Sequence, residues 1–83
     1  MTKVILVTAK WCTKCPAAKN LWKDLQKEYK FDYKEVDLMS DDGKKIQERF
    51  EILSVPTTIV NNRIVFVDVP EREKAINTIK EVD

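Results

Sequence analysis

Histidine is absent from this chain of 83 residues. Catalysis by a serine or cysteine paired with histidine is therefore excluded, and so is any zinc site that needs an imidazole. Long apolar runs are also missing, since none exceeds the four residues of 4–7 or 64–67 and a helix needs about 20 apolar residues to cross a bilayer. The N-terminus lacks the apolar segment of a signal peptide, so we expect a cytoplasmic protein.

Neither sign of charge dominates. The chain has fifteen Lys and Arg residues and fourteen Asp and Glu residues, for a net charge of +1, and residues of the two signs are interspersed along it. No basic tract suggests binding to nucleic acid or to an anionic membrane surface. The length suits one domain with a modest core and leaves no room for a second, so we expect residues 1–83 to form a single domain.

Cysteine occurs only twice, as Cys12 and Cys15. In a reducing compartment a close pair favours redox or metal chemistry over a structural bridge. A disulfide across so short a loop would also remove little entropy from the unfolded chain. Two cysteines supply only two of the four ligands of a structural zinc ion, so a metal would need a second chain.

The residues around the pair indicate a strand followed by a helix. Residues 4–7 are continuously apolar, as in a strand buried on both faces, and we expect this strand to cover residues 3–8. Apolar residues then recur at helical spacing, at Ala18, Leu21, Trp22, Leu25 and Tyr29. We therefore expect Cys12 at the N-terminus of a helix that ends near residue 29, with Cys15 one turn later on the same face. There the helix dipole, Lys10 and Lys14 would stabilise a Cys12 thiolate.

The remaining chain predicts five further elements. Residues 31–37 form a charged strand at a sheet edge, and a helix follows from the cap at Ser40 to about residue 50. Residues 57–60 and 63–67 form a hairpin around Asn61-Asn62. A last helix begins near Pro70. The inward side chains of the last two helices are predicted to be Ile46, Phe50, Leu53, Ile76, Ile79 and Val82. The order β-α-β-α-β-β-α predicts an α/β fold with a four-stranded mixed sheet and helices on both faces.

Two motifs in this order resemble the thioredoxin and glutaredoxin superfamily. The first is the Cys-x-x-Cys pair between strand and helix, whose second cysteine begins the segment Cys-Pro-Ala-Ala-Lys. The second is the later segment Val-Pro-Thr-Thr-Ile-Val-Asn-Asn. The resemblance runs from about residue 3 to residue 79 and is strongest to small archaeal-type members of glutaredoxin size. It implies the thioredoxin fold and an enzyme that reduces protein disulfides without a cofactor.

The resemblance also implies roles for single residues. Cys12 would attack a substrate disulfide as a thiolate, and the more buried Cys15 would resolve the mixed disulfide. The Val55–Pro56 bond would be cis and lie beside the dithiol, with the Val55 backbone open to substrate. Trp11 is either a core aromatic residue or a docking surface, and its position before the helix favours a half-exposed side chain that offers an apolar surface for docking. The substrates would be protein disulfides and a reductase would supply electrons to a monomer.

The sequence departs from the superfamily at two places. Thioredoxins carry a buried aspartate where this chain has Leu6. Glutaredoxins that bind glutathione have a Gly-Gly pair and an aspartate where this chain has Val67-Asp68-Val69-Pro70. Glutathione-dependent activity is therefore an alternative that the sequence disfavours. A second alternative is a binding module that carries a metal or an iron–sulfur cluster between two chains.

Overall fold

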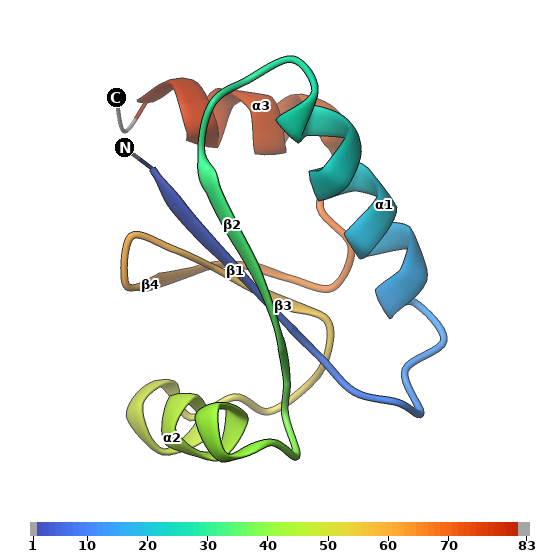
Figure 1. The fold of residues 1–83 in the computed structure, drawn as a ribbon, viewed down its shortest axis with the longest axis vertical. Helices are drawn as coiled ribbons and strands as arrows, with labels where there is room; N and C mark the ends of the chain where they lie inside the picture. Colours follow the sequence, from blue (N-terminus) through green and yellow to red (C-terminus); the bar gives the residue numbers. More distant parts are fainter. Residues whose placement is uncertain (1, 82–83) are drawn as a thin grey trace.

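The computed structural model describes residues 2–81, which form four strands and three helices (Figure 1). They follow one another as β1 (Lys3–Thr8), α1 (Cys15–Gln26), β2 (Asp32–Asp37), α2 (Asp41–Phe50), β3 (Thr57–Val60), β4 (Arg63–Val67) and α3 (Arg72–Glu81). The predicted order of elements is confirmed, and the bounds of β1, β3 and β4 are those expected from the sequence.

The four strands form one mixed sheet in the order β2-β1-β3-β4. β1 runs parallel to β2 and antiparallel to β3, and β3 pairs antiparallel with β4. The hairpin between β3 and β4 turns at Asn61 and Asn62, whose φ angles are 49° and 67°. Asparagine tolerates this left-handed conformation better than most residues, and the turn sets Val60 opposite Arg63.

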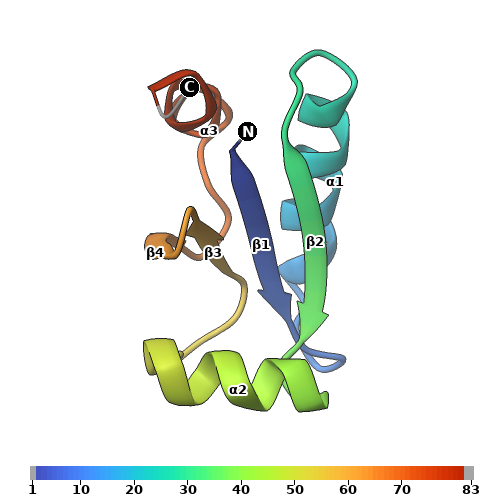
Figure 2. The same cartoon turned by 60° about the vertical axis from the view of Figure 1, so that its left-hand side comes forward.

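Helices cover both faces of the sheet, as predicted (Figure 2). α1 and α3 lie on one face, where Val4 and Leu6 of β1 join their buried side chains. α2 lies across the other face, where Val7 of β1 packs with Ile59. Successive residues of a strand point to opposite faces, so the continuous apolar run of β1 supplies both cores.

The core on the face of α1 and α3 centres on Trp22. Its side chain is fully buried, and its ring centroid lies 5.9 Å from that of Phe31 and 6.3 Å from that of Phe66. The indole Nε1 donates a hydrogen bond to Thr58 Oγ1 at 3.3 Å. This bond joins α1 to β3, the strand that follows Pro56. Trp22, one of the apolar residues at helical spacing, is therefore a core residue.

α1 ends at Gln26 and not near residue 29. The Lys27 N–H donates to the Asp24 carbonyl at 3.2 Å. This bond spans three residues, as in the tighter 3₁₀ turns that often end an α-helix. Tyr29 nevertheless packs against the core from the following turn. The apolar stripe therefore continues past the end of the helix.

α2 begins as predicted, with Ser40 as its N-cap. The Ser40 hydroxyl accepts a hydrogen bond from the Gly43 N–H at 3.0 Å. Gly43 is buried against the preceding turn, and a Cβ at this position would lie 2.7 Å from the Leu38 Cα. The single glycine of the chain therefore serves a close approach of two backbone segments.

The prediction that Leu53 faces inward is wrong. Glu51 follows α2 in the left-handed conformation with φ 54°, which turns the chain so that Ile52 enters the core. Ile52 is 3% exposed and Leu53 is 96% exposed. Ile46 and Phe50 pack against this core as expected.

α3 begins at Arg72, two residues after Pro70, and buries Ala75 and Ile79 against the core of α1. Ile76 packs beside them, whereas Val82 lies outside the described residues. None of the helices within residues 2–81 has the length and apolar character needed to span a membrane.

Candidate functional site

The two cysteines lie where β1 hands the chain to α1, and they form a disulfide. Their Cα atoms are 5.4 Å apart. Cys12 is partly exposed, whereas Cys15 is 2% exposed. The Cys12 N–H donates to the Ala9 carbonyl at 3.1 Å, which holds the preceding residues in a turn. One sulfur is thus accessible from outside and the other is covered.

Cys12 lies between β1 and the N-terminus of α1 as expected, but the expectation that Cys15 lies one helical turn after it is wrong, because α1 begins at Cys15. Pro16 has no N–H to donate to the Cys12 carbonyl, so an α-helix cannot extend back to Cys12. The first hydrogen bond of this end runs from the Ala18 N–H to the Lys14 carbonyl at 3.3 Å. Cys12 therefore precedes the helix, and Cys15 opens it. The unpaired N–H groups of the first turn still face this end of the chain.

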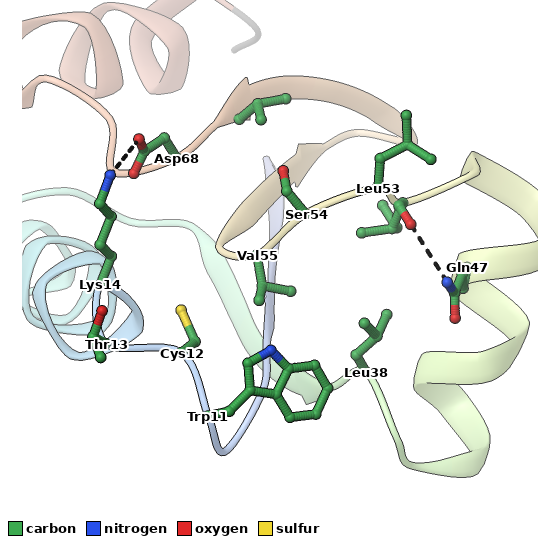
Figure 3. Close-up of a pocket in the computed structure, with 12 residues that line it drawn as sticks. Trp11, Cys12, Thr13, Lys14, Leu38, Gln47, Leu53, Ser54, Val55 and Asp68 are labelled. Carbon is green, nitrogen blue, oxygen red and sulfur yellow. Dashed lines mark hydrogen bonds and ion pairs between the residues drawn. The ribbon is translucent and has the colours of Figure 1, made fainter.

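The segment before β3 contributes the second part of the site. The Val55–Pro56 peptide bond is cis, as the family resemblance implied. Pro56 is fully buried, and its carbonyl accepts a hydrogen bond from the Asp68 N–H at 2.8 Å. Val55 is half-buried and lies across the groove from Cys12 (Figure 3).

A groove of about 580 Å³ connects these segments (Figure 3). It brings together four of the predicted site residues, which the sequence separates by up to 44 positions: Trp11, Cys12, Lys14 and Val55. Its lining comprises Trp11, Cys12, Thr13, Lys14, Leu38, Gln47, Ile52, Leu53, Ser54, Val55, Val67 and Asp68. Cys15 and Pro56 do not line it.

Trp11 stands at the edge of this groove and is 63% exposed. This is somewhat more than the half exposure expected from the sequence. Its other side borders a second hollow, which it shares with Lys10 and Met39. Lys10 therefore lies away from the groove of Cys12, whereas Lys14 lines it.

Lys14 forms an ion pair that the sequence analysis missed. Its Nζ lies 3.0 Å from Asp68 Oδ2. Asp68 follows β4 with φ 81°, and its Oδ1 accepts a hydrogen bond from the Val69 N–H at 2.8 Å. The Val69 N–H and then the Lys14 ammonium hold the pKa of Asp68 below its usual value. No sequence pattern links two residues 54 positions apart.

Metal ligands do not gather at this site. Within residues 2–81, no group of three or more His, Cys, Asp or Glu side chains is placed to hold a metal ion. The site thus consists of the Cys12–Cys15 disulfide, a groove lined by both apolar and polar side chains, and one ion pair.

Comparison with known proteins shows that this chain is similar to thioredoxins. Residues 1–80 match the family model of the thioredoxin domain. A thioredoxin of Methanocaldococcus jannaschii is 31% identical over 80 residues, which cover 94% of this chain and 92% of that protein. Among solved structures, thioredoxin-2 of a malaria parasite aligns with a TM-score of 0.80 and 26% identity, over 98% of this chain and 82% of that one.

A thioredoxin preprotein of Schistosoma mansoni aligns with a TM-score of 0.77 and 26% identity, over 96% of this chain and 77% of that one. The fold is thus shared with these solved structures along nearly the whole chain. The chain belongs to the thioredoxin family, and it is a thiol–disulfide oxidoreductase.

Proposed function

We propose that this protein reduces the disulfides of other proteins, with Cys12 as the attacking thiol and Cys15 as the resolving thiol. The difference in exposure between the two sulfurs carries this proposal. Cys12 lines the groove, whereas Cys15 is covered by the fold. A substrate disulfide can reach only the sulfur of Cys12, and Cys15 can reach only a sulfur already bound to Cys12.

The reaction follows in two exchanges. The Cys12 thiolate attacks one sulfur of the substrate disulfide, and the other substrate sulfur leaves as a thiolate. The Cys15 thiolate then attacks Cys12 and displaces the second substrate sulfur. The substrate gains two electrons and two protons, and the protein is left with the Cys12–Cys15 disulfide that the structure contains.

The groove suits an extended, mostly apolar substrate segment. Trp11 offers an exposed ring at one side, and Val55 faces Cys12 from the segment before β3 (Figure 3). We propose that a substrate segment pairs with the backbone at Val55 as an added strand. Pro56 would hold Val55 in place for this pairing. Its ring also presents no polar side chain to the dithiol.

Lys10 and Lys14 are proposed to lower the pKa of Cys12, because positive charge near a thiol favours the thiolate. Lys14 lines the groove with Cys12, whereas Lys10 acts from the neighbouring turn. The first turn of α1 adds the positive end of the helix dipole. The proposal includes a single domain that works as a monomer in the cytoplasm and receives electrons from a reductase.

Single replacements of the two cysteines test these roles. The Cys12→Ser variant should lose all reduction of insulin disulfides, whereas Cys15→Ser should accumulate mixed disulfides that mass spectrometry detects. Brief alkylation of the reduced protein at neutral pH should label Cys12 well before Cys15. Preferential labelling of Cys15, or trapping of substrate by the Cys12→Ser variant, would reverse the assignment.

A further inference from the structure

Asp68 has no part in the function proposed above, although it lies in the groove of Cys12. Lys14 and Asp68 are the only charged side chains among the described residues that line this groove. Lys14 stands between Cys12 and Cys15 in the sequence, and Asp68 reaches its Nζ from the turn after β4, at 3.0 Å (Figure 3). The electric field at the Cys12 sulfur therefore depends on how these two charges share the site.

The position of the Asp68 carboxylate is set by its own turn and not by Lys14. Its backbone N–H donates to the Pro56 carbonyl at 2.8 Å. Its Oδ1 accepts from the Val69 N–H, also at 2.8 Å. Lys14 has a flexible side chain that is largely exposed. The ammonium group is therefore the partner that moves, and Asp68 decides where it rests.

An ammonium held against a carboxylate stabilises a neighbouring thiolate less than a free ammonium does, because it cannot move closer to the sulfur. A less stable thiolate gives a less acidic thiol. It also makes the reduced dithiol less stable relative to the disulfide, which is the property of a stronger reductant. We propose that Asp68 is a positioning residue that restrains Lys14 and thereby keeps the Cys12 thiol less acidic and the dithiol more reducing. This inference rests on the proposed role of Cys12.

Asp68 is ionised wherever Cys12 titrates. Its pKa lies below the usual value because the Val69 N–H and the Lys14 ammonium stabilise the carboxylate, whereas thiols titrate near pH 8.5. Lys10 also carries charge near the dithiol, on the turn before Trp11, and it shares the second hollow with Asp37. Those two residues lie outside the groove and are unchanged in the experiment below.

The Asp68→Asn variant tests the proposal with little change of shape. Asparagine tolerates a positive φ, and its side-chain oxygen accepts the Val69 hydrogen bond as the carboxylate does. In the reduced protein we expect a lower pKa of Cys12, read from the pH profile of its alkylation rate. Below that pKa, the rate should rise about two- to fivefold, the range for an exposed ion pair. Equilibration with glutathione should show a shift toward the reduced dithiol.

The effect has to pass through Lys14. In a Lys14→Gln background, Asp68→Asn should change the rate much less than in the wild-type chain, since no ammonium is then released. A rise of the same size in both backgrounds would show that the carboxylate acts without Lys14 and would overturn the proposal. An unchanged or slower rate in Asp68→Asn alone would overturn it as well.

The Asp24→Asn variant is the matched control. Asp24 forms a similar exposed ion pair with Arg72 at 2.7 Å, and its replacement changes the net charge equally. It lies nine residues after Cys15 on α1, about 13.5 Å along the helix, which exceeds the screening length of about 8 Å at physiological salt. We expect no change in its alkylation profile, and an equal change would assign the effect to net charge. If the wild-type protein failed to reduce insulin, the proposed function would be wrong. The inference on Asp68 would still be tested, because the acidity of Cys12 is measured without a substrate.

Discussion

The hydrogen bond between Trp22 and Thr58 links the helix that begins at Cys15 to the strand that follows Pro56. Replacing Thr58 with valine keeps the shape of the side chain and removes the acceptor. The indole N–H would then stay buried without a partner, because Trp22 is fully enclosed. We expect the free energy of unfolding to fall by about 1–3 kcal/mol. In a chain of this size that is a fall in Tm of roughly 4–24 °C.

The Trp22→Phe variant shows whether the bond is the cause. Its own cost should stay below the roughly 3–5 kcal/mol that loss of a whole buried tryptophan brings. In that background, Thr58→Val should cost close to nothing, because no indole N–H remains to be stranded. Urea unfolding followed by far-ultraviolet circular dichroism measures all four chains in the oxidised form. Equal costs of Thr58→Val in both backgrounds, within about 0.5 kcal/mol, would refute this account of the bond.

Three further predictions follow from single positions. Gly43→Ala should lower the free energy of unfolding by about 1–3 kcal/mol, because the new Cβ would meet the Leu38 backbone at 2.7 Å; a stabilised variant in urea unfolding would contradict this. Burial and the hydrogen bond to Glu35 raise the pKa of Tyr33 above its usual value, so the unfolded chain loses this proton first as the pH rises above about 10. Stability should therefore fall more steeply above pH 10 in the wild-type chain than in Tyr33→Phe, and parallel profiles would argue against it. Leu53→Ser should leave stability within about 0.5 kcal/mol and raise KM for a protein disulfide, since Leu53 is 96% exposed in the groove; an unchanged KM would remove Leu53 from the docking surface.

Elements whose cause is local could be predicted from the sequence. The apolar run of β1 and the turn at Asn61 and Asn62 each depend on a few adjacent residues, and the structure has them where expected. The Ser40 cap is a similar case, because one hydroxyl satisfies a nearby N–H. In the site, the family resemblance supplied the cis bond before Pro56, which local physics alone would not have favoured.

The errors have equally definite causes. The start of α1 was placed too early because the apolar pattern says nothing of hydrogen bonds, whereas Pro16 lacks the N–H that would include Cys12 in the helix. Leu53 was assigned to the core because helical spacing was continued through Glu51. A single left-handed residue there changed which side chain faces inward. In both errors, the backbone of a single residue outweighs the periodicity of the side chains.

The pairing of Lys14 with Asp68 belongs to a third class, which no local pattern predicts. It requires the turn after β4 to lie beside the turn before α1, and this follows from the sheet order. β3 lies next to β1 and antiparallel to it, so the segment before β3 meets the C-terminal end of β1 at one end of the sheet. The hairpin then returns Asp68 to the same end of the sheet, where its N–H donates a hydrogen bond to the Pro56 carbonyl. The dithiol, the groove and the ion pair therefore share one end of the sheet because of its topology.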